Sequence, residues 1–146
     1  MFYDVSGPGN VAAGIYAGGN VRYGAEARIS SSVIVGKALK SWTVYLRRVG
    51  SPSGPVHSTV RRTSDDAIVA TFSETLDSAT LPATFTPFTF TLPTAYMIQT
   101  GDRILIEYAG PNRIDISIWN VDKIDGYKTG RVRCSGSTHV GFNTED

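Results

Sequence analysis

The segment Ser41–Arg48, Ser-Trp-Thr-Val-Tyr-Leu-Arg-Arg, limits what this chain can form more than any other stretch. Successive side chains of a β-strand point to opposite faces of a sheet. The apolar members of this alternation share one face, and they are Trp42, Val44 and Leu46. The polar and aromatic members share the other, and they are Thr43, Tyr45 and Arg47. A Gly/Pro-rich run at 50–55 follows, so the pattern predicts a half-buried strand that ends in a tight turn.

The same alternation recurs along the chain, between turns that draw on 15 glycines and 7 prolines. The expected longer strands are Ala25–Ser30, Leu39–Val49, Val56–Thr63, Ala67–Ser73, Phe85–Leu92, Arg103–Tyr108 and Ile114–Val121, and the shorter ones are Thr129–Cys134 and His139–Asn143. Turn signals at intervals of roughly 8–12 residues are typical of sandwiches and barrels. No segment has the apolar period of a helix. We therefore expect an all-β fold: a single β-sandwich of jelly-roll type, with about eight antiparallel strands in two sheets.

Residues 1–146 are expected to form one domain, in which residues 1–23 are an irregular arm or a first strand. The short turn at 64–66 predicts a hairpin between the strands on either side of it. The connection at 74–82 has room for one helical turn, which Asp77 or Ser78 could cap.

Composition excludes several classes of protein. A hydrophobic content of 41% with 18% charged residues is incompatible with a disordered chain. A net charge of +1 gives no field that would attract nucleic acid or an anionic membrane. No apolar run reaches the roughly 20 residues that a membrane-inserted helix requires. The start of the chain at Met1 lacks the basic and apolar regions of a signal peptide, and the chain can equally be a module of a longer secreted protein.

The sequence offers little for catalysis, and we expect no enzyme. Cys134 is the single cysteine, so neither an intrachain disulfide nor a thiolate zinc cluster can form. His57 and His139 do not have the spacing of metal ligands, and no nucleophile elbow is present. Glu107 shares a strand face with Arg103, where a cross-strand ion pair is the simplest interpretation.

The segment 114–119 gives the most specific candidate binding site. If its three isoleucines face the core, Asp115, Ser117 and Trp119 share the opposite face. A solvent-facing indole beside a carboxylate and a hydroxyl suits a sugar, because the apolar face of a pyranose packs on the ring while its hydroxyls need polar partners. Tyr45, Arg47 and Arg61 would extend this face if their strands belong to the same sheet. Alternatively, Trp119 is covered by a loop or by the N-terminal arm and belongs to the core.

Acidic residues suggest a calcium site as a second candidate. Calcium takes six to eight oxygen ligands, many of them from loops. The candidate ligands are Glu26, Asp122, Asp125 and Asp146. The alternative is that these residues shape turns and cap strands, as aspartates often do without metal.

Several stretches resemble a known group of modules, and they are Val35–Lys37, Val44–Gly54, Thr80–Leu81, Phe88–Phe90, Ile98–Tyr108 and Ile124–Gly126. The group comprises jelly-roll modules of large extracellular, often multi-domain proteins of archaea and bacteria, of the carbohydrate-binding or surface-anchored kind. The resemblance implies an extracellular or cell-surface location. It also implies calcium, since such modules often carry one acidic residue on the first strand and another near the last, where Glu26, Glu145 and Asp146 are similarly placed.

Two functions are consistent with these features. The first is a non-catalytic carbohydrate-binding module that recognises a polysaccharide or surface glycan through Trp119, Tyr45, Asp115, Arg47 and Arg61. The second is a structural or adhesive assembly domain of surface-layer, filament or virion type. Such a domain would bind protein neighbours or copies of itself through a sheet edge, with residues 1–23 available for strand addition.

Overall fold

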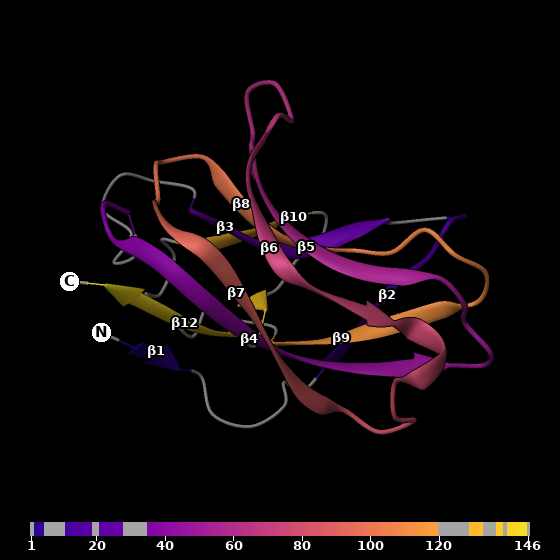
Figure 1. Cartoon of the computed structure of the whole chain (residues 1–146). Coiled ribbons are helices and arrows are strands. Elements are labelled where there is room, and N and C mark those ends of the chain that lie inside the picture. The colour runs from indigo at the N-terminus through magenta and orange to yellow at the C-terminus, as the bar shows by residue number, and fades with distance from the viewer. Residues whose placement is uncertain are drawn as a thin grey trace.

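The computed structural model describes residues 2–4, 11–18, 21–27, 35–119, 129–132, 137–138 and 140–145 (Figure 1). Its strands are β1 (Phe2–Asp4), β2 (Val11–Ile15), β3 (Arg22–Ala27), β4 (Ala38–Val49), β5 (Pro55–Arg62), β6 (Ile68–Asp77), β7 (Thr86–Met97), β8 (Asp102–Glu107), β9 (Arg113–Trp119), β10 (Thr129–Val132), β11 (Ser137–Thr138) and β12 (Val140–Glu145). One 3-10 turn, η1 (Ser78–Thr80), lies between β6 and β7. Among these residues, no helix has the length and hydropathy that spanning a lipid bilayer requires.

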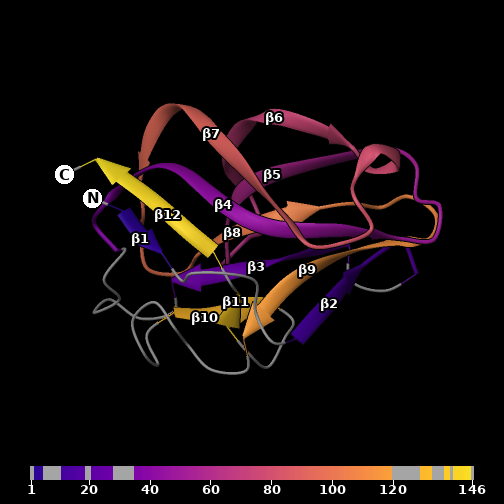
Figure 2. The same cartoon turned by 90° about the horizontal axis from the view of Figure 1, so that it is seen from below.

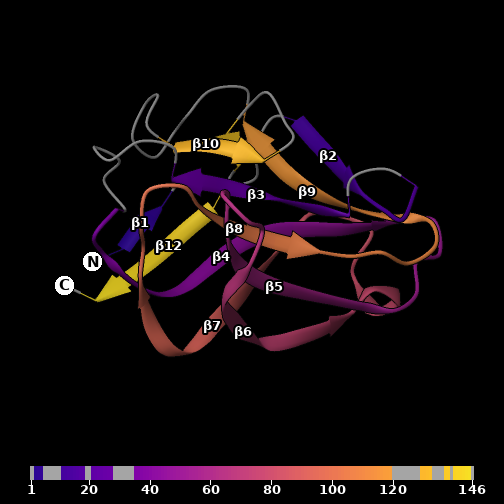
Figure 3. The same ribbon diagram turned by 90° about the horizontal axis from the view of Figure 1, so that it is seen from above.

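The strands form two antiparallel sheets, which confirms the predicted all-β sandwich. The first sheet contains the order β2-β9-β4-β7, and β12 and β9 pair with successive parts of β4. The second sheet has the order β10-β3-β8-β5-β6, which Figure 3 shows in full. From β2 to β9 the chain changes sheet at every connection except the one between β5 and β6. β1 pairs with β12, so the two ends of the chain lie together (Figure 2).

The alternation in β4 builds the core as predicted. Trp42, Val44 and Leu46 are fully buried between the sheets. The Trp42 ring lies 6.3 Å from that of Phe72, which in turn meets Phe90 edge-on at 6.5 Å. Such aromatic contacts add stability beyond the apolar area that they bury. Ile114 and Ile116 of β9 are also fully buried, while the side chain of Ile118 lies outside the described residues.

A buried hydrogen-bond chain joins the two sheets across this core. The indole Nε1 of Trp42 in β4 donates to Oγ of Ser58 in β5 at 2.9 Å. The Ser58 hydroxyl donates in turn to the backbone carbonyl of Leu105 in β8 at 2.8 Å. The only polar atom of the indole is thereby satisfied, which removes the penalty for burying it.

Both predicted connections are confirmed. β5 and β6 pair as a hairpin, whose turn projects from the body of the sandwich (Figure 1). η1 is capped by Asp77, whose carboxylate accepts from the backbone N–H of Ala79 at 3.0 Å. At the start of β6, Ile68 is 51% exposed and does not share the buried face of Phe72, although strict strand alternation would place the two side chains on one face. The register shifts between Val60 and Arg61, and such a bulge redirects the side chains beyond it.

Replacing Ser58 by alanine should lower the free energy of unfolding by about 1–3 kcal/mol, because the buried indole N–H and the Leu105 carbonyl lose their partner. Urea unfolding followed by circular dichroism measures the effect. Ser73→Ala is the matched control: Ser73 is exposed in β6, and its loss should change stability by less than about 0.5 kcal/mol. Equal effects of the two substitutions would contradict the assigned role of Ser58.

Candidate functional site

The outer face of the first sheet brings most of the predicted sugar-contacting residues together. β4 and β9 are hydrogen-bonded neighbours in which Arg47 lies opposite Asp115. Tyr45 and Ser117, two residues along each strand, belong to the same face. Trp119 is the last residue of β9, where its backbone pairs with Ser137. Its side chain lies outside the described residues, so its exposure stays a prediction.

The expectation that Asp115 and Ser117 face solvent was wrong. Asp115 is 1% exposed and Ser117 is fully buried. The carboxylate of Asp115 is held by two guanidinium groups: Arg47 Nε and Nη2 lie at 2.9 Å from Oδ2, and Arg113 Nε lies at 3.2 Å from Oδ1. A buried carboxylate is stable only with such compensation. Ile114 and Ile116 belong to the core as predicted, but two arginine side chains pair with Asp115 on the opposite face, so the carboxylate positions these arginines.

Arg47 is fixed from two directions. Its guanidinium carbon lies 4.4 Å from the centroid of the Phe85 ring, a cation–π distance, while Asp115 holds the Nε and Nη2 groups. The side chain remains 34% exposed. Tyr45 of the same face is half-buried and already has partners within the protein. The result is a planar cation of fixed orientation beside aromatic rings, at the surface of the sheet.

Arg61 does not belong to this face, and its predicted role there was wrong. β5, which carries Arg61, pairs with β6 and β8 in the second sheet. The outer faces of the two sheets of a sandwich point in opposite directions. The sequence contained no signal for the sheet to which each strand belongs.

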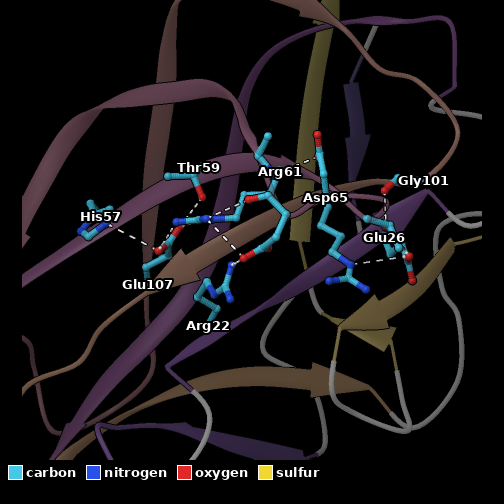
Figure 4. A network of polar contacts seen from close by, with 12 residues as sticks. Arg22, Glu26, His57, Thr59, Arg61, Asp65, Gly101 and Glu107 are labelled. Atoms are coloured by element: carbon cyan, nitrogen blue, oxygen red, sulfur yellow. Dashed lines mark hydrogen bonds and ion pairs between the residues drawn. The ribbon is translucent and has the colours of Figure 1, made fainter.

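The outer face of the second sheet carries a separate polar network centred on Glu107 (Figure 4). Glu107 is 8% exposed, and it accepts from Arg61 Nε at 3.0 Å and Nη2 at 3.2 Å, and also from the hydroxyl of Thr59. His57 Nε2 lies 3.8 Å from the same carboxylate. The predicted cross-strand ion pair of Glu107 is therefore confirmed, with Arg61 as its partner.

The network continues to the turn between β5 and β6. Asp66 has a left-handed φ of 59° and accepts from Arg22 Nη1 at 2.6 and 2.8 Å. Arg61 Nη1 donates to the backbone carbonyl of Asp66 at 3.0 Å. The hydrogen bond from Arg22 holds the pKa of the Asp66 carboxyl below its ordinary value, and the same contact raises the pKa of Arg22. These contacts fasten the projecting turn to β3 and β5, which is a structural role.

The proposed calcium ligands are not brought together in the described part of the chain. Glu26 accepts from the Thr63 hydroxyl at 2.8 Å and lies 3.6 Å from Arg103 Nε. Asp122, Asp125 and Asp146 fall outside the described residues. Within those residues, no group of three or more His, Cys, Asp or Glu side chains is placed to hold a metal ion. Calcium therefore stays a prediction from the sequence.

Sequence reasoning missed two residues of the first outer face. Arg113 could have been found, since it lies two residues before Asp115 and so shares its face. Phe85 could not, because its contact with Arg47 depends on the pairing of β4 with β7, which brings residues 38 positions apart side by side.

Substitution of Asp66 by asparagine keeps a residue that tolerates the left-handed backbone but removes the charge. We expect the free energy of unfolding to fall by about 0.5–1 kcal/mol at pH 7, as for a partly exposed ion pair. Because the pKa of Asp66 is lower folded than unfolded, its stabilisation is complete above about pH 4 and is lost as the pH falls through the folded-state pKa. Urea titrations of both proteins from pH 7 to pH 2 should therefore converge; a constant difference would contradict the ion pair.

No family model matches the chain, and neither a curated protein nor a solved structure gives a match.

Proposed function

We propose that this chain is a non-catalytic binding module that recognises a polysaccharide or surface glycan through the outer face of its first sheet. The observation that carries the proposal is the fixation of Arg47 between the Asp115 carboxylate and the Phe85 ring, on the same face as Tyr45. A sheet surface that presents an oriented planar donor and aromatic side chains suits a ligand that is itself flat, apolar on its faces and polar at its edge.

Sugar rings have this character. Their apolar faces pack on aromatic rings, and the proposed platforms are Tyr45 and Trp119. A guanidinium offers its donors in one plane, which matches two neighbouring hydroxyls or a carboxylate of the ligand. Because Asp115 and Phe85 already fix Arg47, little side-chain entropy is lost on binding.

We propose the jelly roll as the finer fold type. Two observations support this fold type. The strand orders are β2-β9-β4-β7 and β3-β8-β5-β6, and from β2 to β9 the chain crosses between the sheets at all but one connection. They are the orders produced when two Greek keys are wound into eight strands, an architecture shared by lectin and capsid domains. An extracellular or cell-surface location follows from the sequence resemblance and stays part of the same proposal.

The alternative, an assembly domain that binds protein neighbours by strand addition, receives less support at the β7 edge of the first sheet. β7 contains Pro87 and Pro93, which cannot donate to a neighbouring strand. The backbone N–H of Thr91 donates to Glu74 Oε1 at 2.6 Å, so one of the donors of the strand is already taken. Prolines and charged side chains on an edge discourage pairing with another chain.

Substitution of Tyr45 or Trp119 by alanine should weaken glycan binding about tenfold or more, the equivalent of about 1.4 kcal/mol for a lost stacking contact. Affinity electrophoresis through a panel of soluble polysaccharides, with pull-down on insoluble ones, measures this. Circular dichroism establishes that each variant is folded. If both variants migrate like the wild type in every gel, or if no glycan retains the wild type, the proposal is wrong.

Arg47→Lys and Arg61→Lys form a matched pair for the same experiment. Each arginine pairs with a buried carboxylate on the outer face of a sheet, but the two faces are opposite. Only Arg47→Lys, which removes the guanidinium of the first outer face, should reduce glycan binding. Equal losses would place the site elsewhere. A defined oligomer in size-exclusion chromatography, together with no glycan binding, would favour assembly.

A further inference from the structure

A shallow hollow lies at one end of the outer face of the first sheet. Its volume is about 480 Å³, and it is lined by Tyr16, Val49, Gly50, Asn112 and Arg113. Val49 at the end of β4 is paired with Arg113 at the start of β9, and Arg47 is paired with Asp115 one step along the same face. The hollow is therefore continuous with the face that carries Arg47.

Tyr16 provides an exposed aromatic ring at this hollow. It directly follows β2 and is 39% exposed. The ring lies beside the backbone of two glycines: a Cβ at Gly14 would lie 3.6 Å from the ring and one at Gly18 would lie 3.7 Å from it, both ordinary contact distances. A Cβ at Gly14 would also lie 3.2 Å from Cδ of Arg113. The Tyr16 ring thus has glycine backbone on one side, and its exposed part lines the hollow.

The turns around the hollow are tied together. The hydroxyl of Tyr108 accepts from the backbone N–H of Ser53 at 3.3 Å and also donates to the carbonyl of Pro111. Asn112, with a left-handed φ of 55°, donates from Nδ2 to the carbonyl of Ser51 at 3.1 Å. The β4–β5 and β8–β9 turns are linked by these bonds, so the walls of the hollow are organised before any ligand arrives.

The charge around the hollow is positive. Arg113 is 49% exposed, and its Nε lies 3.2 Å from Oδ1 of Asp115. Arg47 shares that carboxylate, and Arg48 donates from Nη1 to the carbonyl of Gly50 at 3.3 Å, at the rim. Two guanidinium groups thus share the single carboxylate of Asp115, and a third bonds to the backbone at Gly50, in a chain whose overall net charge is only +1. Such a local excess favours an anionic ligand.

We propose that this hollow is a subsite for an acidic sugar unit, one that bears a carboxylate or a sulfate group, and that the glycan bound by the module is therefore acidic. This inference rests on the function proposed above. The sugar ring packs on Tyr16, and Arg113 pairs with the anionic group, since guanidinium binds carboxylate and sulfate through parallel hydrogen bonds. Residues 45 and 49 are about 13 Å apart along β4 at 3.3 Å per residue, so an oligomer, not a single sugar, reaches both subsites.

The test measures affinity for two matched pairs of polymers: polygalacturonate against its carboxyl-reduced neutral form, and dextran sulfate against dextran. We expect at least one anionic polymer to bind tenfold or more tightly than its neutral counterpart, with an affinity that falls as salt is raised. If the neutral polymers bind equally well or better, the inference that the ligand is acidic is wrong, whereas the proposal of glycan binding still holds. If no glycan of either kind binds, the proposed function itself fails as well.

Variants locate the subsite. Tyr16→Ala and Arg113→Gln should each weaken binding of the anionic polymer about tenfold. Arg62→Gln is the matched control, since Arg62 is 52% exposed against 49% for Arg113 and carries the same charge, but belongs to the second sheet. If Tyr16→Ala and Arg113→Gln bind like the wild type while Tyr45→Ala does not, the module binds glycan but the hollow is not part of its site. If Arg62→Gln loses as much affinity for the anionic polymer, the effect reflects the overall charge of the protein, and the proposed subsite is wrong.

Discussion

The sandwich depends on β4 and on the hydrogen bond that Trp42 of this strand donates across the core to Ser58. β4 pairs with β7, β9 and β12, so the first sheet is assembled around it. The indole places the largest apolar group of the core beside Phe72 while its N–H reaches Ser58, and through Ser58 the Leu105 carbonyl. A ring without a polar atom would fill the same space but would not specify which parts of the two sheets face each other.

Both outer faces use the same physical solution for a buried acid. Asp115 on the first sheet and Glu107 on the second are each compensated by guanidinium groups from a neighbouring strand. The surroundings separate their roles. Arg61 is tied to the Asp66 turn as well as to Glu107 and is 18% exposed. Arg47 is 34% exposed and lies against an aromatic ring, and Arg113 on the same carboxylate lines the hollow. The first network thus presents cations at the surface, where we propose that a ligand binds, whereas the second fastens a turn.

A surface of this kind suits the glycan recognition that we propose. The described part of the first outer face presents cations held by a buried acid and by an aromatic ring, with glycines and tied turns at its end. Such preorganisation lowers the entropic cost of binding an extended polymer. The prolines of β7, together with the Glu74 carboxylate of β6 that accepts from the Thr91 N–H, leave that edge poorly suited to pairing with another chain.

The local sequence pattern, which comprises side-chain alternation and the turn and capping residues, by itself determined the fold class, the core face of β4, the hairpin between β5 and β6, and the capped turn at η1, because each depends on residues close together in the chain. It also identified residues 115 and 117 as facing away from the core isoleucines. Only the tertiary structure decided that arginines cover Asp115, that Arg61 lies on the opposite side of the sandwich, and that Phe85 and Tyr16 join the candidate surface. Those outcomes depend on which strands become neighbours, and strand pairing between distant segments is set by packing of the whole core, which local periodicity does not contain.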